Sequence, residues 1–354
     1  MTVSPLVVIG NPDNRRVSLF RAATRAAGLT DPTVVAWRDV AAGAPVAIEA
    51  GSLVRVDSPG EDAEVDRLLR GADEPAAHGE IVGLAAWYRG FLGALRRVEL
   101  AARGSRLCND PSEIAVLFDK RACHALLRSQ GIPVPPALDT PRSYAHLVSL
   151  MDDAGWSRVF VKPVHGSSAS GVLALRRHRG RVLATTSVEP SQGRLFNSLR
   201  VRDYSSPETI ESIVDKLAPD GLHVERWFPK ADLDGMVMDL RVVVIAGRPS
   251  HVVVRTSRGP ITNLHLGGAR GSLPEVLERA GRRRYRAAME TCERVAACFP
   301  GCLQVGVDLM FSSDWSRHAV AEVNAFGDLL PGLLVDGSDT YAAQLAALMP
   351  AVAA

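Results

Sequence analysis

The sequence predicts an α/β (α+β) protein built from several domains, and three observations support this fold class. The first hundred residues alternate short apolar strands with helices, a pattern typical of a parallel sheet. Beyond residue 222 the apolar runs are joined by tight turns, which is typical of antiparallel sheets. The length of 354 residues corresponds to two or three domains, at about 150 residues each.

Composition restricts the classes of function. The 41 basic and 39 acidic residues give a formal net charge of +2, so we expect no binding to nucleic acid or to a membrane. Hydrophobic residues make up 47% of the chain, enough for a packed core, and no apolar run reaches the about 20 residues that span a bilayer. The first residues lack a signal-peptide pattern and the five cysteines lack a CxxC pair, so we expect a cytoplasmic protein with reduced thiols.

Lysine is rare in this chain, which makes its positions informative. Only four of the 41 basic residues are lysine, namely Lys120, Lys162, Lys216 and Lys230. Because arginine serves elsewhere, a retained lysine indicates a place that needs a compact ammonium group on a flexible stem.

The first region predicts a small α/β unit. Its expected strands lie at 6–9, 34–37 and 52–56, and its expected helices at 15–27, 61–70 and 91–102. No GxGxxG fingerprint follows the first strand and the chain has no P-loop signature, which disfavours Rossmann dehydrogenases and P-loop NTPases. Arg15 and Arg16 are candidates to hold a substrate carboxylate, although a solvated helix end is the simpler interpretation.

The second region begins with a strong helix-start signal. Asp110 and Pro111 predict a helix that runs to Gln130, where a glycine and three prolines end it. The segment 185–204 has no specific motif, and we expect it to be a loop that contacts the substrate. The remaining expected elements are strands at 160–163, 171–175, 240–246, 251–256, 303–310 and 318–324, and a helix at 273–298.

Three oxygen-bearing side chains near the end of the chain form the most specific pattern. Glu322 and Asn324 are two residues apart in a strand, so they share a face, and a turn near Ser313 would bring Asp308 opposite them. Carboxylate and amide oxygens are ligands that suit Mg²⁺. A solvated sheet edge, with the acids paired to arginines, is the alternative.

Two further clusters point to anions. Lys162 opens a loop of small residues whose backbone N–H groups would approach phosphate oxygens, although composition alone also fits a flexible hairpin loop. Asn263 lies near a glycine pair and two arginines, Arg255 and Arg258, and these groups would orient an anionic reacting group. His165 and His265 are better explained as structural residues.

Together these fragments resemble the ATP-grasp superfamily, specifically its RimK-like and glutathione-synthetase-like carboxylate–amine ligases. The resemblance covers roughly residues 109–334. The landmarks occur in the family's order: Asp119-Lys120, residues 131–135, Val161-Lys162-Pro163, residues 223–228, Asp239-Leu240-Arg241, Arg255, residues 263–268, Asp308 and Glu322-Val323-Asn324-Ala325.

The resemblance implies an ATP site and its residues. Lys120 and Lys162 would contact ATP, toward the adenine and the α/β-phosphates respectively. The loop expected to close over the triphosphate contains Gly166, Ser167, Ser168 and Gly171. The expected adenine and nucleotide contacts are Glu225, Arg226, Trp227 and Asp239.

The resemblance also implies the reaction. Arg255 and Asn263, with Arg258 nearby, would lie at the γ-phosphate and acyl group as the catalytic residues. Asp308, Glu322 and Asn324 would bind two Mg²⁺ ions, with Mn²⁺ as an alternative. The implied activity is ADP-forming carboxylate–amine ligation on a small-molecule or peptide acid, and a homodimer is common among relatives.

The implied architecture has three parts. They are a pre-ATP-grasp α/β domain at 1–106, a central subdomain with the phosphate-binding lid loop at 107–222, and an antiparallel-sheet subdomain with the hinge and metal site at 223–354.

The sequence departs from the family pattern at three places. The stretch 230–238 is longer than usual, Arg226 replaces a common acidic residue, and Ile261 stands where many relatives carry arginine. Two alternatives stay open: a kinase-like phosphotransferase on the same fold, and a non-catalytic ATP-binding module, which the departures at Arg226 and Ile261 favour.

Overall fold

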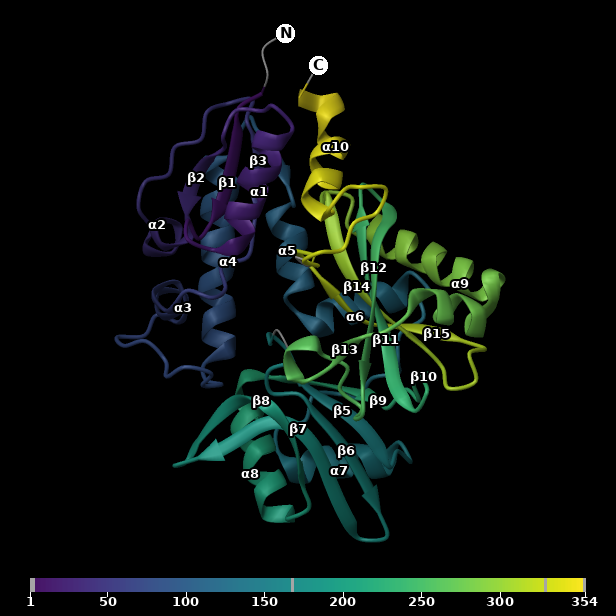
Figure 1. Ribbon diagram of the computed structural model, residues 1–354. Helices are drawn as coiled ribbons and strands as arrows, with labels where there is room; N and C mark the ends of the chain where they lie inside the picture. Colours follow the sequence, from purple (N-terminus) through teal and green to yellow (C-terminus); the bar gives the residue numbers. More distant parts are fainter. Residues whose placement is uncertain (1–3, 167–168, 328–329, 353–354) are drawn as a thin grey trace.

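Three β-sheets organise the chain in the computed structural model, which describes residues 4–166, 169–327 and 330–352. The sheets follow one another along the long axis of the molecule, with the N-terminal sheet at one end and the middle sheet at the other (Figure 1). The α/β (α+β) prediction is therefore confirmed. No helix in the described part of the chain combines the length and apolarity of a membrane span.

The N-terminal sheet is parallel, as the alternation of strands and helices predicts. Its strand order is β2-β1-β3-β4, and all three pairings are parallel. The strands are β1 (Leu6–Gly10), β2 (Thr33–Ala36), β3 (Leu53–Val56) and β4 (Arg106–Cys108). The helices are α1 (Arg15–Ala26), α2 (Trp37–Ala42), α3 (Ala63–Arg70) and α4 (Leu84–Ala101).

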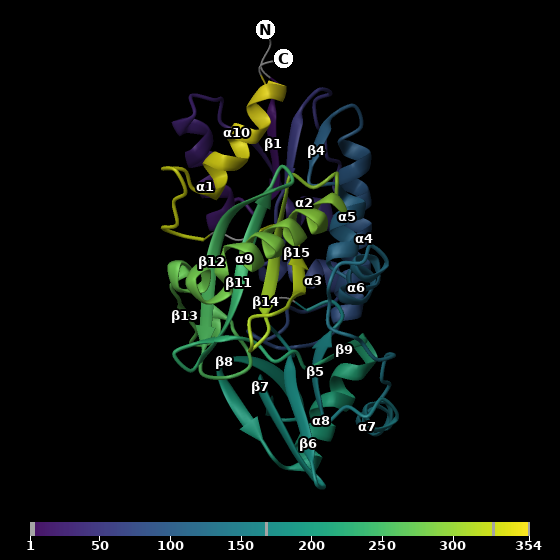
Figure 2. The same ribbon diagram turned by 90° about the vertical axis from the view of Figure 1, so that its right-hand side faces the viewer.

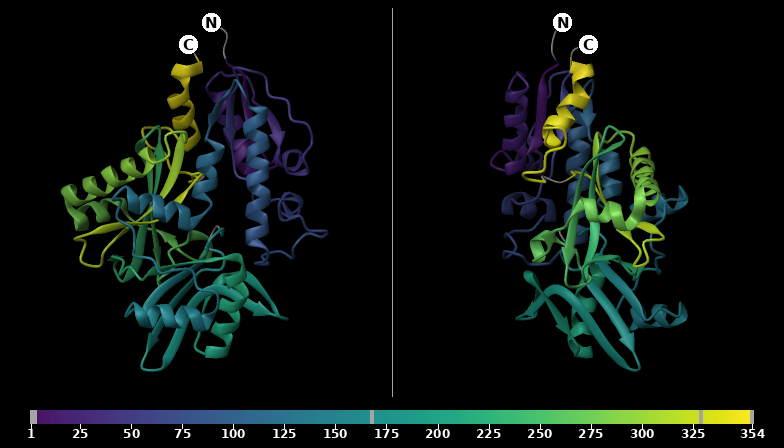
Figure 3. Two further views of the ribbon diagram at one scale, coloured as in Figure 1. Left: turned by 180° about the vertical axis from the view of Figure 1, so that it is seen from behind. Right: turned by 45° about the vertical axis from the view of Figure 1, so that its right-hand side comes forward.

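Helix α4 begins earlier than the sequence predicts, and it connects two parts of the molecule. Its first two N–H groups donate to the Asp220 carboxylate at 3.0 and 3.1 Å, beside the middle sheet. From there it runs along the N-terminal sheet (Figure 3). The predicted start at Phe91 is wrong, since the helix already includes Gly90. A glycine stands at this position because α3 crosses α4 closely there.

Replacement of Gly90 by alanine should destabilise the protein by about 1–3 kcal/mol or more. A Cβ at this position would lie 1.9 Å from the Leu69 carbonyl oxygen, so α3 and α4 would have to move apart. Gly93 in the same helix has no atom within 4 Å of its Cβ position, so Gly93→Ala should stabilise by about 0.5–1 kcal/mol. Urea denaturation of both variants tests the pair. Equal effects would contradict this close approach.

The middle sheet is antiparallel throughout, with strand order β8-β7-β6-β5-β9. Its strands are β5 (Arg158–Pro163), β6 (Leu173–His178), β7 (Arg181–Ser191), β8 (Arg194–Tyr204) and β9 (Leu222–Arg226). Helices α7 (Tyr144–Asp153), α8 (Pro207–Leu217) and the short η1 (Ala218–Asp220) accompany it. The proposed subdomain boundary at residue 223 thus falls inside β9.

The prediction of a loop at 185–204 is wrong. This segment is most of the β7–β8 hairpin, which turns at Gln192 and Gly193, both with positive φ. Residues 184–188 of β7 are buried, and 184–186 of them pair with β6, so tertiary packing outweighs the polar composition of the segment.

The C-terminal sheet has the order β13-β12-β11-β14-β15, and β10 also pairs with β11. Its strands are β10 (Asp232–Leu233), β11 (Met236–Ile245), β12 (Arg248–Ser257), β13 (Ala269–Arg270), β14 (Gln304–Phe311) and β15 (His318–Asn324). The short η2 (Leu264–Leu266) lies between β12 and β13, and α9 (Leu273–Ala297) follows with a break at Gly281, whose φ is 74°.

The predicted continuous helix 110–130 is two helices, α5 (Pro111–Leu117) and α6 (Lys120–Ser129). The break occurs because the Asp119 side chain accepts hydrogen bonds from the N–H groups of Arg121 and Ala122, both at 2.9 Å, and so caps α6. As a result Lys120 is the first residue of α6.

Helix α10 (Thr340–Val352) returns to the N-terminal sheet and packs beside α1 (Figure 2). The contact includes Phe20 and Tyr341, whose ring centroids are 6.3 Å apart. One apolar core extends from the N-terminal strands through α4, α5 and α6 to β14 and β15. This shared core holds the C-terminal sheet in place beside the first region.

Candidate active site

A cleft lies between the middle and C-terminal sheets. Side chains from both sheets line it, and most of the charged ones are buried or nearly so. The lining residues are Pro135, Phe160, Lys162, Ala169, Val172, Glu225, Arg226, Phe228, Lys230, Asp239, Arg241, Arg255, Pro260, Ile261, Thr262, Asn263, Asp308, Met310, Ala321, Glu322 and Asn324.

Strand register brings the oxygen-bearing side chains together as the sequence predicts. Asp308 of β14 pairs directly with Glu322 of β15, and Asn324 pairs with Gly306, two residues along each strand. Since alternate residues share a face, all three side chains lie on the same side of the sheet. On the other side of β14, Asp308 pairs with Arg241 of β11.

Arg255 lies between the two buried aspartates and contacts both of them. Arg241 Nε donates to Asp308 Oδ1 at 2.5 Å, and Arg255 Nη2 lies 3.1 Å from Asp308 Oδ2. Arg255 Nε also donates to Asp239 Oδ1 at 2.7 Å. Burial opposes ionisation of Asp239, but Arg255 and Lys230 outweigh it and lower the pKa of Asp239. These contacts keep the Asp239 carboxylate ionised in a largely desolvated site.

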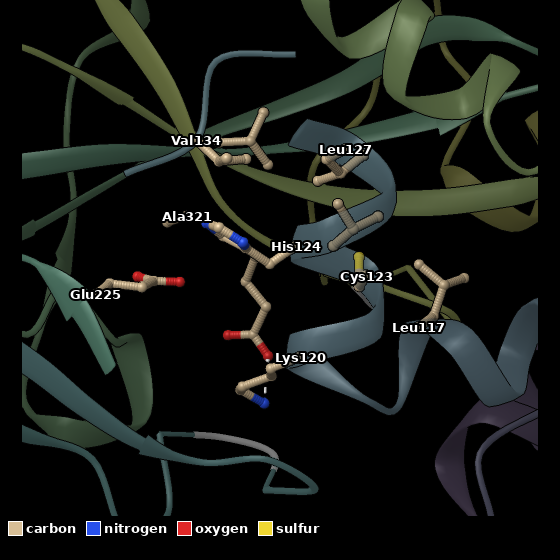
Figure 4. Close-up of a pocket in the computed structure, with 11 residues that line it drawn as sticks. Leu117, Lys120, Cys123, His124, Leu127, Val134, Glu225 and Ala321 are labelled. Carbon is tan, nitrogen blue, oxygen red and sulfur yellow. Dashed lines mark ion pairs between the residues drawn. The ribbon is translucent and has the colours of Figure 1, made fainter. Parts of the chain in front are cut away.

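Lys120 lies at a second hollow beside the main cleft. Its Nζ is 3.0 Å from Glu322 Oε1 and also donates to the Gly166 carbonyl oxygen. Figure 4 shows α6, with Cys123 and His124, on one side of this hollow and Glu225 on the other. Burial opposes ionisation of Glu322, but Lys120 and Lys162 lower its pKa.

Lys162 is held in a buried chain of charges. Its Nζ donates to Glu225 Oε2 at 2.6 Å and to the Ala321 carbonyl at 3.2 Å, and Glu225 Oε1 lies 2.8 Å from His223 Nε2. Burial alone would raise the pKa of Glu225, but Lys162 and His223 lower it to about 2. The pKa of Lys162 is raised, because nearby carboxylates outweigh the effect of burial.

The protein should lose stability in acid as Glu225 is protonated. Its pKa in the folded chain is lower than its ordinary value of 4.5, so its contribution is present above pH 4.5 and is lost toward pH 2. The shift corresponds to something on the order of 3 kcal/mol. Urea denaturation from pH 7 to pH 2 should show that wild type and Glu225→Gln converge in acid. A stability difference independent of pH would contradict this pKa.

The glycine-rich loop is only partly described. Gly166 accepts the Lys120 contact, whereas the predicted contacts Ser167 and Ser168 lie outside the described residues. Gly171 has a φ of 72°, and a Cβ there would lie 2.5 Å from Pro163 Cγ. Only glycine fits this position, which lets the loop return over the end of β5.

The predicted hinge residues do not all face the cleft. Glu225, Arg226 and Phe228 line it, whereas Trp227 is absent from its lining and packs on Phe160 with ring centroids 4.9 Å apart. Arg226 also lies over the Trp156 ring, 5.8 Å from its centroid.

Two of the three predicted catalytic residues line the cleft, and the third lies elsewhere. Arg255 and Asn263 line the cleft, and the Asn263 side chain caps η2 by accepting from the His265 N–H at 2.8 Å. Arg258 lines a separate hollow with Leu199 and Val201 instead. Arg16 donates to the Phe326 carbonyl at 3.2 Å, and neither it nor Arg15 lines the cleft.

Sequence reasoning assigned no role at the site to three polar residues of the cleft: Lys230, Arg241 and Thr262. Arg241 is two residues from Asp239 on β11, so strand alternation places it on the same face and identifies it in retrospect. The rarity of lysine identifies Lys230: three of the four lysines lie at the site, and only Lys216 is elsewhere, on α8. Thr262 has no signal in the sequence.

The donor set of β14 and β15 fits Mg²⁺. Two carboxylates and an amide from adjacent strands face one cleft, which is the hard-oxygen chemistry that this ion prefers. The described residues contain no cluster of three His, Cys, Asp or Glu side chains that would hold a metal alone. Binding would therefore depend on Asn324 and on oxygens of a bound phosphate.

The chain has the ATP-grasp fold, because solved ATP-grasp structures match 96–100% of its length. The order of landmarks in the sequence predicts this fold, and the prediction is confirmed. No protein-family model matches the sequence, and neither does any curated protein.

Three solved structures illustrate the likeness. ATP-grasp ligase PsnB, complexed with a phosphomimetic variant of its minimal precursor, Mg and ADP, is 18% identical with a TM-score of 0.56, covering 100% of both chains. Macrocyclase MdnC from Microcystis aeruginosa MRC, bound to precursor peptide MdnA, is 12% identical with a TM-score of 0.54, covering 99% of this chain and 100% of MdnC. The RimK-domain ATP-grasp protein from Sphaerobacter thermophilus DSM 20745 is 15% identical with a TM-score of 0.53, covering 96% of this chain and 98% of the RimK-domain protein.

Proposed function

We propose that the protein is an ATP- and Mg²⁺-dependent ligase that activates a substrate carboxylate as an acyl phosphate and couples it to an amine. One observation carries the proposal: the cross-strand set of Asp308, Glu322 and Asn324 faces the same cleft as Lys162 and Arg255. A site with paired cations and an oxygen donor set suits a polyphosphate and its metal ions.

The proposed reaction has two steps. A carboxylate oxygen of the substrate attacks the γ-phosphorus of ATP, and ADP leaves. The amine nitrogen then attacks the acyl carbon, loses a proton, and phosphate leaves with the former carboxylate oxygen. Both steps demand positioning and neutralisation of negative charge more than covalent help from the protein.

The chain's own residues divide this work. Asp308, Glu322 and Asn324 would hold Mg²⁺, which neutralises charge on the phosphates when bound. Lys162, and Lys120 from the neighbouring hollow, supply point charges to the nucleotide. Arg255 and Asn263 bind the reacting group, and the loop that ends at Gly171 excludes water from the acyl phosphate.

The substrate acid is either a small molecule or a peptide. PsnB and MdnC were each solved with a precursor peptide, which favours testing peptide acids first. Arg258 lies beside Leu199 and Val201 in its separate hollow, and we assign it no direct catalytic contact.

A screen of acids and amines for ADP and phosphate release tests the function. For an acid that responds, ¹⁸O in its carboxylate should appear in the released phosphate, and release should require the amine. A stable phosphorylated product formed without amine would instead identify a phosphotransferase. Tight ATP binding without turnover in any combination would identify a binding module.

A further inference from the structure

Lys230 is a nearly buried residue of the cleft whose charge is weakly balanced by its neighbours in the described chain. It lies in the linker between β9 and β10, and its side chain is 9% exposed. Its Nζ lies 3.3 Å from Asp239 Oδ2 and 2.6 Å from Thr262 Oγ1, and it faces the cleft.

Asp239, the acid that Lys230 contacts, is already engaged. Asp239 binds Arg255 through its other oxygen at 2.7 Å, and it also accepts from Thr262. The 3.3 Å separation of Lys230 from Asp239 exceeds the 2.6 Å of Lys162 from Glu225 and the 3.0 Å of Lys120 from Glu322. Lys230 therefore has the longest carboxylate contact of the three lysines.

The pKa shifts of Lys230 and Lys162 agree with these distances, because the lysine with the longer carboxylate contact has the lowered pKa. Burial lowers the pKa of Lys230, and Arg255 and Lys162 lower it further against the opposing effect of Asp239. The pKa of Lys162 is raised, because Glu225 and Glu322 outweigh burial. A buried ammonium group with too little negative charge around it favours an additional anion.

The geometry leaves room for that anion. An ammonium group has three donors, and the described contacts of Lys230 use two of them, on Asp239 and Thr262. Ile261, beside Thr262, is buried in an apolar cluster with Val172 and Leu266, so this wall of the cleft supplies no charge of its own at that position.

We propose that Lys230, held by Thr262, forms an anion subsite in the cleft that binds an oxygen anion of the reacting group. This inference rests on the proposed function, and it adds to that function a residue from the hinge linker. The anion is either the terminal phosphoryl group of ATP or the substrate carboxylate, which share the same oxygen chemistry.

Calorimetric titration of the whole protein with AMPPNP and with ADP, both with Mg²⁺, tests the subsite. A second titration adds acetate to the complex with Mg²⁺ and AMPPNP. If the anion is the terminal phosphoryl group, Lys230→Met should weaken AMPPNP by about tenfold relative to ADP. If it is the carboxylate, acetate binding should weaken by about tenfold while both nucleotides are unaffected.

Two matched variants sharpen the test. Thr262→Val keeps the charge but removes the hydroxyl that positions Nζ. It should therefore weaken, by a few-fold, the same binding that Lys230→Met weakens, either AMPPNP relative to ADP or acetate. Lys216→Met, on α8, removes an ammonium group that donates to the Gly193 carbonyl and does not line the cleft, so it should change neither nucleotide preference nor acetate binding.

The inference is overturned if Lys230→Met and Thr262→Val bind ADP normally and change neither the preference for AMPPNP over ADP nor the affinity for acetate. The same holds if wild type neither prefers AMPPNP to ADP nor binds acetate. If wild type binds neither nucleotide, the proposed function itself fails, and that result is distinguishable from failure at Lys230 alone.

Discussion

Replacement of Glu322 by glutamine should reduce ATP-dependent turnover by roughly 10³-fold and leave the fold intact. The substitution keeps the shape of the side chain but removes the negative charge opposite Asp308 and its 3.0 Å contact with Lys120. Steady-state ADP release, with the acid and amine found by screening, measures the effect.

A matched control distinguishes loss of the site from loss of surface charge. Glu290→Gln makes the same chemical change on the exposed face of α9, in an ion pair with Arg286 that is largely in solvent. We expect normal turnover from this variant. Normal turnover from Glu322→Gln as well would show that the oxygen donor set is not the metal site.

Replacement of Lys162 by methionine should destabilise the protein by about 3–5 kcal/mol and abolish nucleotide binding. The loss of stability follows because Glu225 would be left as a buried charge, with His223 as its remaining ion-pair partner among the described residues. Urea denaturation and calorimetric titration with AMPPNP measure the two effects separately.

A double variant separates stability from binding. Lys162→Met with Glu225→Gln removes both charges, so we expect it to recover most of the lost stability. Nucleotide binding should stay absent, because the ammonium group is still missing. Recovery of both properties would show that Lys162 has only a structural role, and Lys216→Met should leave both unchanged.

The sequence predicts the parts of the site that follow from local geometry. The pairing of Asp308 with Glu322 follows from two strands joined by a short turn, and strand alternation then places Asn324 on the same face. The landmarks from Lys120 to Asn324 predict the ATP-grasp fold because their order along the chain is specific to it.

The sequence does not predict features that depend on contacts between distant segments. Lys230 reaches Asp239 and Thr262 only because the linker after β9 lies against the C-terminal sheet, through a bridge to Ser312. Trp227 turns onto Phe160 rather than into the cleft for a similar reason: β5 and β9 are neighbours in the middle sheet.

Two errors in secondary structure have physical causes. The hairpin that contains residues 185–204 looks like a loop because its polar residues obscure the alternation of apolar and polar side chains that is typical of a strand. Pairing of β7 with β6 stabilises the hairpin in the folded chain. The helix broken at Asp119 looks continuous because its apolar period is preserved, whereas the Asp119 side chain begins a new helix. This break also places Lys120 beside Glu322.

A crystal structure of the protein with AMPPNP and Mg²⁺ tests the central claim most directly. We predict a triphosphate in the cleft between the two sheets, with Lys162 at its phosphates and metal density bounded by Asp308, Glu322 and Asn324. Nucleotide bound elsewhere, or phosphates bound in the cleft with no metal near these three side chains, would contradict the account.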